Sequence, residues 1–474
     1  MKRKNLLRGL EAVLFCIVLC AVLWALSELL ERKESGDQFG PFLKDPQQYD
    51  VLFFGDSCFV NCLYPMEIWE DYGIPGYNLS CYGNTLAVSY WTMMNALDYA
   101  SPKAVVFAVN DVRKDIKVTG SSGDLHTALD FWPLSRTKAR AIEDLTDDPY
   151  AMDDDGNRYA DMRWEYYFTL GKYHDRWSRL TPKDFKRRLN VQKGADMMID
   201  VAPARDYDLI DDDQYAEEQG AGYRYMRMAI EECRRRGIEI LLVYLPYPAS
   251  EQSQMHANTV SSIAEEYGVP YINFIQLDSV VDYATDCYDE LAHLNPSGGL
   301  KVTDFIGAYL AEHFALEDRR GEEAYASWQK AGQDYAAYKR DKIRGEDELD
   351  NLLMLLHDDS VSASIAIRVQ AELYWDDQAL TLLHNTVREH VLEADAYSKW
   401  SNSLFPLEGL DEAVWADEAY FLELDRAQGT FTELVGGEAE MRTESVFGDW
   451  EDGKEIRIRV TDPETGELIA ERQF

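Results

Sequence analysis

The run Tyr49-Asp-Val-Leu-Phe-Phe-Gly-Asp-Ser57 decides the fold of this chain. Its apolar and aromatic residues predict a buried strand, and Gly55 ends that strand with a tight turn. In an open parallel sheet, ligands bind at the carboxyl ends of the strands. We therefore expect Ser57 at the functional edge of such a sheet, where a neighbouring base would make its hydroxyl a nucleophile.

Strands and helices alternate after this run. Apolar runs predict further strands over 104–109, 238–245 and 271–274, and helical periodicity predicts helices over 66–72, 223–236 and 297–314. Such alternation requires crossover connections, so the sequence predicts an α/β domain with a doubly wound parallel sheet.

We expect this domain to span residues 34–318, with a polar linker over 32–48 before its first strand. An insertion at about 117–219, rich in aromatic and acidic residues, separates its second and third predicted strands. An insertion of this size next to a catalytic sheet is either a lid or substrate wall, or a set of packed surface helices.

The N-terminus carries an apolar run, Ala12 to Leu26, preceded by four basic residues. With its flanking leucines it can cross a hydrocarbon core of about 30 Å at roughly 1.5 Å per residue. Basic residues before the run favour a cytoplasmic N-terminus, so residues 1–33 are predicted to form a cytoplasmic stub and a transmembrane anchor. A cleaved signal peptide is the alternative, because Ala25 and Ser27 are small residues at the positions that a signal peptidase reads. Both interpretations export the rest of the chain.

Composition excludes several classes of protein. The 474 residues carry 86 acidic and 47 basic side chains, a formal net charge of −39, which repels nucleic-acid phosphates. Five of the seven cysteines follow the apolar run, and their odd number and wide spacing argue against a disulfide framework. They also lack zinc-ligand spacing, so we expect neither a metal site nor a cofactor.

The composition after the α/β domain changes twice. Residues 319–348 are strongly charged and predict a helical connector. Residues 349–474 predict a small α/β or α+β accessory domain, with a helix over 349–356, a strand over 363–369, a helix over 377–391 and a hairpin of 455–460 with 468–474.

Three later segments supply groups that a serine nucleophile needs. Gly83 offers a backbone N–H, and Asn110 offers a side-chain amide, to a developing oxyanion. His293, just before the last predicted helix of the domain, can act as a general base if an acidic side chain orients its imidazole.

These segments resemble, in the same order, the four sequence blocks of the SGNH (GDSL-like) hydrolase superfamily: a Gly-Asp-Ser nucleophile, a Gly, a Gly-x-Asn-Asp segment and a final Asp-x-x-His. The resemblance covers about 49–314 and looks closest to membrane-anchored extracytoplasmic members of Gram-positive bacteria. It implies a flavodoxin-like sheet, Ser57 as nucleophile and His293 as base. Gly83, Asn110 and the Ser57 amide would then be the oxyanion donors.

The sequence departs from the family pattern in two blocks. Ala108 stands where the third block has Gly. In the fourth, Asp289 lies one residue too far from His293, and Glu290 occupies the usual acid position. Either an extra residue is looped out and Asp289 orients His293, which we prefer because the run before it matches, or Glu290 does so with its longer side chain.

His174 and Arg176 also match a segment of these relatives. A guanidinium there would hold a sugar or carboxylate group of a substrate, and a structural tie within the insertion is the alternative.

The resemblance implies an extracytoplasmic serine esterase or acyltransferase that acts, through an acyl-serine intermediate, on O-acyl groups (acetyl above all) of a cell-wall or exopolysaccharide glycan. It also implies a membrane-bound O-acyltransferase as a partner. The alternative is a non-catalytic glycan-binding or scaffold protein that retains the fold, which the irregular acid spacing before His293 permits.

Overall fold

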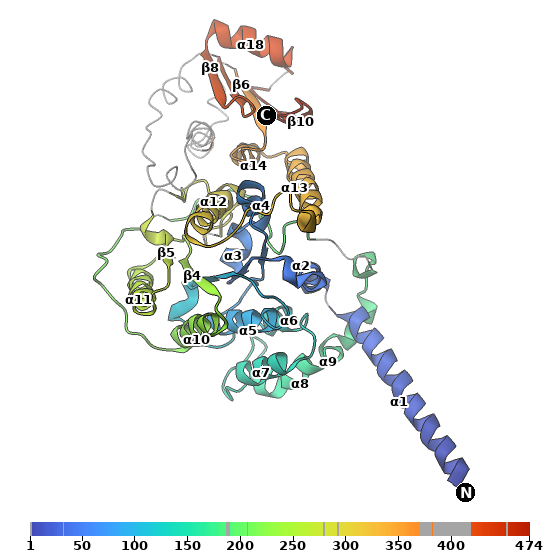
Figure 1. Ribbon diagram of the computed structural model, residues 1–474. Helices are drawn as coiled ribbons and strands as arrows, with labels where there is room; N and C mark the ends of the chain where they lie inside the picture. Colours follow the sequence, from blue (N-terminus) through green and yellow to red (C-terminus); the bar gives the residue numbers. More distant parts are fainter. Residues whose placement is uncertain are drawn as a thin grey trace.

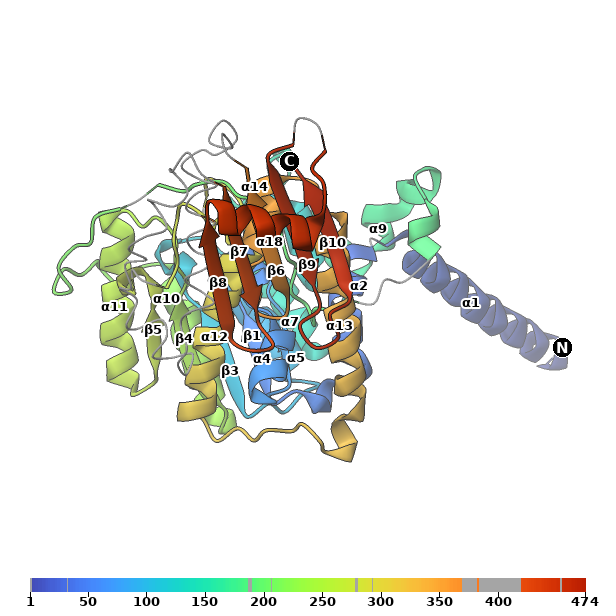
Figure 2. The same ribbon diagram turned by 90° about the horizontal axis from the view of Figure 1, so that it is seen from above.

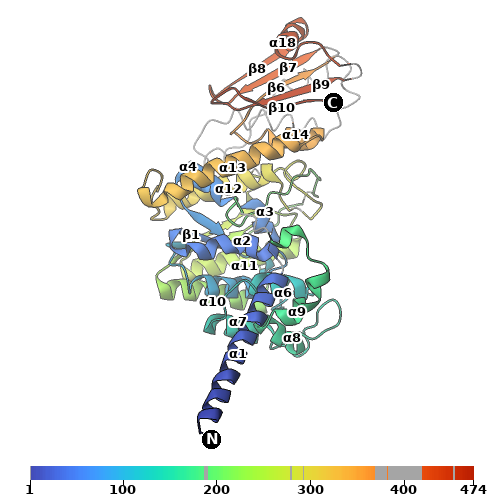
Figure 3. The same ribbon diagram turned by 90° about the vertical axis from the view of Figure 1, so that its right-hand side faces the viewer.

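The computed structural model describes residues 2–474 except 32, 186–189, 206, 278–279, 292, 369–381, 383–418 and 452–453. A long N-terminal helix, an α/β domain and a C-terminal antiparallel sheet follow one another along the chain (Figure 1). The helix α1 (Lys2–Leu30) extends from one end of the molecule, and the antiparallel sheet lies at the opposite end (Figure 3). Within α1, Arg8–Ser27 is long and apolar enough to cross a membrane and is not buried in the protein; a signal sequence meets the same description.

The α/β domain is built on a five-stranded sheet in which all strand pairs are parallel, in the order β2-β1-β3-β4-β5. The four strands that the sequence predicts are confirmed, with ends within two residues. The fifth, β2, was not predicted because its Gly-Tyr-Asn sequence contains no apolar run. The strands are β1 (Val51–Phe54), β2 (Gly76–Asn78), β3 (Ala104–Ala108), β4 (Glu239–Tyr244) and β5 (Tyr271–Asn273).

Both faces of this sheet are buried. Along β1, Leu52 and Phe54 belong to one apolar core, and Val51 and Phe53 belong to another on the opposite face. Parallel strands that are covered on both faces carry such continuous apolar runs. Helices cover the first face with α5 (Leu86–Ala96), α10 (Ala221–Arg236) and α11 (Glu251–Tyr267), and the second with α3 (Ser57–Cys62) and α12 (Pro296–His313).

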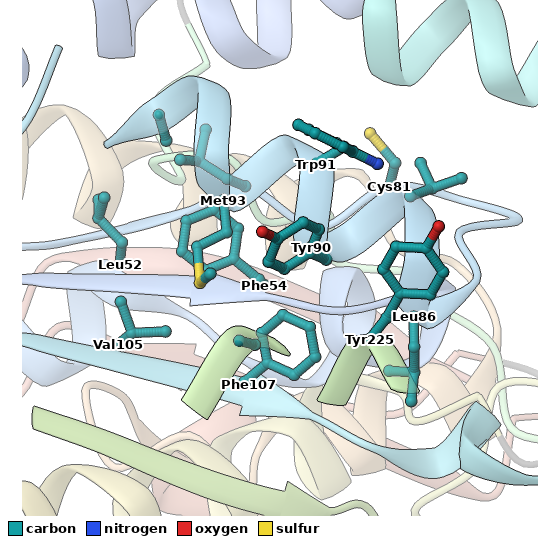
Figure 4. Packing of buried hydrophobic residues seen from close by; sticks show 14 of the residues in the cluster. Leu52, Phe54, Cys81, Leu86, Tyr90, Trp91, Met93, Val105, Phe107 and Tyr225 are labelled. Carbon is teal, nitrogen blue, oxygen red and sulfur yellow. The ribbon is translucent and has the colours of Figure 1, made fainter. Parts of the chain in front are cut away.

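Figure 4 shows the packing on the first face. Phe54 of β1 and Phe107 of β3 lie beneath Tyr90 and Met93 of α5, and Tyr225 of α10 closes the side. Side chains of β1 and β3 therefore pack against α5 and α10 and hold these two helices on the sheet.

The segment after α1 is not a polar linker. Residues Lys33–Lys44 form helix α2, and Phe39 and Phe42 are buried in the core of the domain. Gln38 Nε2 donates to the carbonyls of Ser80 and Gly194 at 3.0 and 2.9 Å. The sequence obscured this helix because Gly36, Gly40 and Pro41 interrupt its helical pattern.

The first half of the insertion is a set of packed helices. The first two are held against α5 by apolar side chains, among them Leu125, Leu129, Ile142 and Leu145, the third packs on these two, and the fourth packs on the third. These helices are α6 (Ser122–Leu129), α7 (Arg136–Leu145), α8 (Tyr159–Tyr167) and α9 (Leu170–Tyr173). Short 3-10 helices complete the domain: η1 (Pro46–Gln48), η2 (Asn110–Arg113), η3 (His174–Ser178), η4 (Pro182–Phe185), η5 (Phe274–Gln276) and η6 (Glu323–Tyr325).

The predicted connector contains helix α13 (Ala326–Gly345), which ties the two halves of the protein together. Its Lys339 ammonium is buried and lies 2.8 Å from Glu67 on α4 (Pro65–Tyr72) and 3.1 Å from Asp358 at the start of the C-terminal part. Burial works to lower the pKa of Lys339, but the two carboxylates outweigh it and raise that pKa well above its usual value. The cation therefore belongs to a buried, charged three-way contact.

The C-terminal sheet is antiparallel, in the order β10-β9-β6-β7-β8. The predicted helix over 349–356, the strand over 363–369 and the final hairpin are confirmed; the predicted helix over 377–391 lies, apart from Leu382, outside the described residues. Strands β7 and β8 were not predicted. The elements are α14 (Leu349–Leu355), β6 (Ser362–Ile367), β7 (Tyr420–Asp425), β8 (Thr430–Val435), α18 (Gly437–Phe447), β9 (Ile456–Thr461) and β10 (Leu468–Gln473).

Replacing Lys339 with Met should destabilise the protein strongly, because Glu67 and Asp358 would be left in the interior without their cation. Removing one partner of a buried ion pair costs about 3–5 kcal/mol. The measurement is the thermal unfolding midpoint of the full chain in detergent. Lys330→Met on the same helix is the control, since Lys330 is exposed, pairs with Asp334 and should cost about 0–1 kcal/mol. Equal losses in the two variants would contradict this account.

Candidate active site

Ser57, His293 and Asp289 form a continuous hydrogen-bonded chain at the carboxyl edge of the parallel sheet. The Ser57 hydroxyl lies 2.8 Å from Nε2 of His293, and Nδ1 of His293 lies 2.7 Å from Oδ2 of Asp289. A carboxylate on Nδ1 favours the tautomer in which Nε2 is free to accept the serine proton. The three side chains thus have the geometry of nucleophile, base and orienting acid.

Asp289 is the acid that orients the imidazole, and the exposed Glu290 has no such contact among the described residues. The second oxygen of Asp289 accepts backbone N–H groups of Leu291 and His293 at 3.0 and 3.1 Å. The structure thus brings Asp289, and not Glu290, into contact with the imidazole.

The loop that carries Asp289 and His293 is fixed to the start of α12. Asn295 caps that helix by accepting from the Gly298 N–H at 3.2 Å, and its amide donates to the carbonyl of Thr285 at 2.7 Å. A bridge between Cys287 and Leu294 closes the base of the loop.

A buried ion pair between Asp286 and Lys301 fixes the same loop to α12. Asp286 accepts from Lys301 of α12 at 2.8 Å and from the Ser297 hydroxyl at 2.7 Å. The side chains of Asp286 and Lys301 are 0% and 6% exposed. Such a pair persists in the interior when further hydrogen bonds satisfy it, and here the backbone N–H of Asp282 supplies one more, at 2.8 Å.

The turn that carries Ser57 depends on Gly55. A Cβ at this position would lie 2.8 Å from the Cβ atoms of Ala108 and Phe59, which is too close for any side chain. The next residue, Asp56, accepts from the Cys58 N–H at 3.0 Å and caps α3, so Ser57 is the first residue of that helix. Ala108, the departure from the family pattern, thus packs directly against the nucleophile turn.

Gly83 lies in a loop that is tied to the same turn. The carbonyl of Gly55 accepts from the backbone of Cys81 at 3.3 Å and from the amide of Asn84 at 3.2 Å. Gly83 has φ +70°, a left-handed conformation that favours glycine, and a Cβ there would lie 2.2 Å from the Asp124 carboxylate and would displace it. Within the described residues, the backbone N–H groups of Ser57 and Gly83 donate to no protein acceptor.

Asn110 follows β3, which pairs with β1, so it starts at the same edge as Ser57. Its side-chain oxygen accepts from the Leu245 N–H at 2.9 Å, and its amide donates to the Leu245 carbonyl at 3.2 Å. This pairing with the end of β4 orients the amide and uses one of its two N–H groups. Among the described residues, its other N–H has no protein acceptor.

Asp56 has a perturbed acidity. Burial, with a further contribution from the nearby Asp111, raises the pKa of its carboxyl to about 6, against the opposing effects of Lys114, the Cys58 N–H and His293. Lys114 is itself paired with Asp111 at 2.6 Å. A second carboxyl that changes charge near pH 6 therefore lies next to the nucleophile.

The second half of the insertion runs along the catalytic loops and α3. The backbone N–H of Asp196 donates to Val60 of α3 at 3.0 Å, and that of Ala202 donates to Cys287 at 3.0 Å. The packed-helix interpretation therefore holds for the first half, and the second half packs against α3 and the loop before Asp289.

His174 and Arg176 are not brought to Ser57. Arg176 donates to the carbonyls of Leu30 and Glu31 at 2.5 and 2.7 Å, and His174 Nδ1 lies 2.8 Å from the carbonyl of Gly171. In Figure 2 the neighbouring helix α9 lies beside the end of α1, well away from the parallel sheet. The expected substrate contact is replaced by the structural tie, because the last carbonyls of a helix need donors.

Sequence reasoning did not single out Asn84, Asn295 or Lys301, which position the site. The Asn-Pro pair before the last predicted helix could have identified Asn295 as a helix cap. Nothing in the sequence pairs Lys301 with Asp286, since the partners are 15 residues apart and meet only through the fold.

Among the described residues, no group of three or more His, Cys, Asp or Glu side chains is arranged to hold a metal ion. A scan against protein-family models and a search of the curated proteins each found no match to this chain.

Asp289→Asn should slow the reaction of Ser57 with a fluorophosphonate probe by about 10³–10⁴-fold, because the amide favours the wrong imidazole tautomer. Glu290→Gln is the matched control and should react at nearly the wild-type rate. The measurement is the second-order labelling rate of the full chain. A larger loss in the Glu290 variant would identify Glu290 as the acid instead.

Asp56→Asn should stabilise the protein above pH 6. The folded carboxyl keeps its proton to about pH 6, whereas the unfolded one loses it near pH 4, so wild-type stability falls as pH rises between these values. Asparagine cannot ionise and still caps α3. Denaturant titrations should give equal free energies of unfolding below pH 4 and an advantage of about 1–2 kcal/mol above pH 6, after allowance for partial exposure. A difference that is independent of pH would contradict this origin.

Proposed function

We propose that this protein is an extracytoplasmic serine esterase or acyltransferase of the SGNH type, acting on O-acyl groups, above all acetyl groups, of a cell-envelope polysaccharide. The observation that carries the proposal is the chain from Ser57 through His293 to Asp289. The strand order 2-1-3-4-5 of the parallel sheet, which flavodoxin-like folds share, supports the SGNH interpretation.

In the first half-reaction, the Ser57 oxygen attacks the acyl carbonyl while His293 Nε2 takes the serine proton. Negative charge develops on the former carbonyl oxygen. The N–H groups of Ser57, Gly83 and Asn110 are the donors available to it at this edge. His293 then returns the proton to the leaving glycan oxygen, which leaves an acyl-Ser57 ester.

The second half-reaction runs the same steps in reverse. A hydroxyl group attacks the acyl-Ser57 ester, His293 takes the proton of that hydroxyl, and the proton returns to Ser57 as the ester breaks. If the hydroxyl belongs to water, the enzyme is an esterase; if it belongs to a glycan, the enzyme is an acyltransferase. The two differ in whether water is excluded from the acyl-enzyme.

Two contacts support retention of the N-terminal helix as a membrane anchor. The hydroxyl of Ser27 lies 2.8 Å from that of Thr169, and Arg176 caps the helix at Leu30 and Glu31. A signal peptide that is cleaved off would not remain hydrogen-bonded to the folded domain in this way. The proposed location is therefore a single-pass membrane protein with the catalytic domain outside the cell, and secretion after cleavage is the alternative.

A cell-wall or exopolysaccharide glycan is the substrate that this location makes available, and a membrane-bound O-acyltransferase is a fitting source of acyl groups. Both partners are inferred from the family resemblance. A nucleic-acid partner is disfavoured by the net charge of −39.

The competing proposal is a non-catalytic glycan-binding protein with the same fold. Its sequence basis was the irregular spacing between the acid and His293. That basis is weakened, because Asp289 reaches the imidazole at 2.7 Å and the imidazole reaches Ser57 at 2.8 Å.

The full chain in detergent should be labelled by a fluorophosphonate probe, and Ser57→Ala and His293→Ala should both abolish labelling, since the probe reports an activated serine. His313→Ala is the matched control: this exposed histidine at the end of α12 should leave labelling unchanged. A folded wild-type chain that resists labelling would favour the glycan-binding alternative.

Incubation with p-nitrophenyl acetate should leave one acetyl group on Ser57, detectable by peptide mass spectrometry after an acid quench. Chase with water or with an acetyl-free envelope glycan should show which acceptor removes it. Acetate release alone supports an esterase, and acetylated glycan supports an acyltransferase. Acetylation at other residues but not at Ser57 would contradict the acyl-serine mechanism.

A further inference from the structure

Exposed aromatic side chains gather on the part of the insertion that contacts the N-terminal helix. We call this group the aromatic collar; its members are 37–71% exposed, although large aromatic groups usually bury their rings. The collar consists of Trp164 and Tyr167 on α8, Phe168 just before α9, Trp177 on η3 and Phe185 on η4; the exposed Trp24 belongs to α1 itself.

Direct contacts hold the collar at the end of α1. Thr169, next to Phe168, is hydrogen-bonded to Ser27 at 2.8 Å. Arg176, next to Trp177, caps the last carbonyls of α1 and also pairs with Asp184 at 2.7 Å, the neighbour of Phe185.

Trp164 of α8 packs against α9, which contacts α1. The Gly171 backbone is so close to its ring that a Cβ there would lie 2.0 Å from it. Figures 1 and 3 show α8 and α9 grouped where α1 leaves the α/β domain. The collar is therefore continuous with the helix and not a separate surface.

The depth of these contacts follows from the length of the apolar span. Arg8–Ser27 contains 20 residues and covers a hydrocarbon core of about 30 Å at roughly 1.5 Å per residue. Ser27 then marks the outer end of that core. Glu31 lies about 6 Å further along the helix, which is the thickness of one headgroup layer. Thr169 and Arg176 thus meet α1 at the two borders of this layer.

We propose that the aromatic collar inserts into the headgroup layer of the outer leaflet, so that the lipid surface itself holds the catalytic domain against the membrane. Trp and Tyr favour this layer because their rings are amphipathic. The inference rests on the anchored form of the protein proposed above and adds a second membrane contact to it.

Aromatic insertion does not depend on the charge of the lipid. The whole chain has a net charge of −39, but the segment 172–188, which carries Trp177 and Phe185, has seven basic and two acidic residues. Insertion of the rings should therefore be tested on a zwitterionic surface, where this local charge contributes little. Helix α2 follows α1 almost directly and is docked in the core through Phe39 and Phe42, which limits rotation of the domain about its anchor. The C-terminal sheet then faces away from the membrane (Figure 3).

The test uses the full chain in phosphatidylcholine vesicles, with and without lipids brominated near the headgroup end of the acyl chain. Bromine quenches tryptophan at short range, and the difference between wild type and a Trp→Phe variant isolates one tryptophan. The fluorescence that these differences assign to Trp164 and to Trp177 should fall by about half in vesicles with brominated lipid. Aqueous iodide should quench it little, because interfacial rings are shielded from water. Phenylalanine keeps each ring apolar, so the fold and the collar persist.

Two controls separate the collar from the anchor. Trp24→Phe is the positive control, because the span alone places Trp24 in lipid. Trp450→Phe, a partly exposed tryptophan of the C-terminal domain, should show no bromine quenching. Loss of the Trp24 response would overturn the anchor and the collar together. A normal Trp24 response with iodide quenching at Trp164 and Trp177 would overturn the collar alone and would favour a membrane protein as the occupant of this surface.

Discussion

The buried ion pair between Asp286 and Lys301 is the contact on which the proposed catalytic geometry depends. It joins the loop that carries the acid and the base to the helix that packs under the nucleophile. Charges are expensive to bury, and this pair is tolerable because every oxygen of Asp286 has a donor: Lys301, Ser297 and the Asp282 amide. A loop held this firmly keeps His293 within hydrogen-bond distance of Ser57 without help from a ligand.

Close backbone approach is the second constraint. A Cβ at Gly55 would lie 2.8 Å from Ala108 and Phe59, and a Cβ at Gly83 would lie 2.2 Å from the Asp124 carboxylate, so glycine lets the first loop approach β3 and α3 and the second loop approach α6. The Gly55 carbonyl accepts hydrogen bonds from the Cys81 N–H and the Asn84 amide, and these bonds fix the second loop to the first. Among the described residues, the backbone N–H groups of Ser57 and Gly83 have no protein acceptor, as proposed donors to an oxyanion would require.

The insertion has a different task in each half. Its helices α8 and α9 and the turns after them connect the domain to α1, while residues 193–204 run beside the catalytic loops. One segment of chain therefore contacts both the end of α1 and the surroundings of Ser57. At the other end of the domain, Lys339 joins α4 to the C-terminal part through a buried cation, so the accessory sheet is also coupled to the catalytic domain by charge.

The sequence by itself determined the α/β class, four of the five parallel strands, the apolar N-terminal span and the candidates Ser57, His293, Gly83 and Asn110, because apolar periodicity and turn chemistry are local properties. Only the tertiary structure brought Asp289, and not Glu290, to the imidazole, since the choice depends on which carboxylate the local backbone directs at His293. It alone placed Arg176 at the end of α1, 145 residues away along the chain. Contacts between distant segments follow from packing, which a local pattern of residues does not encode.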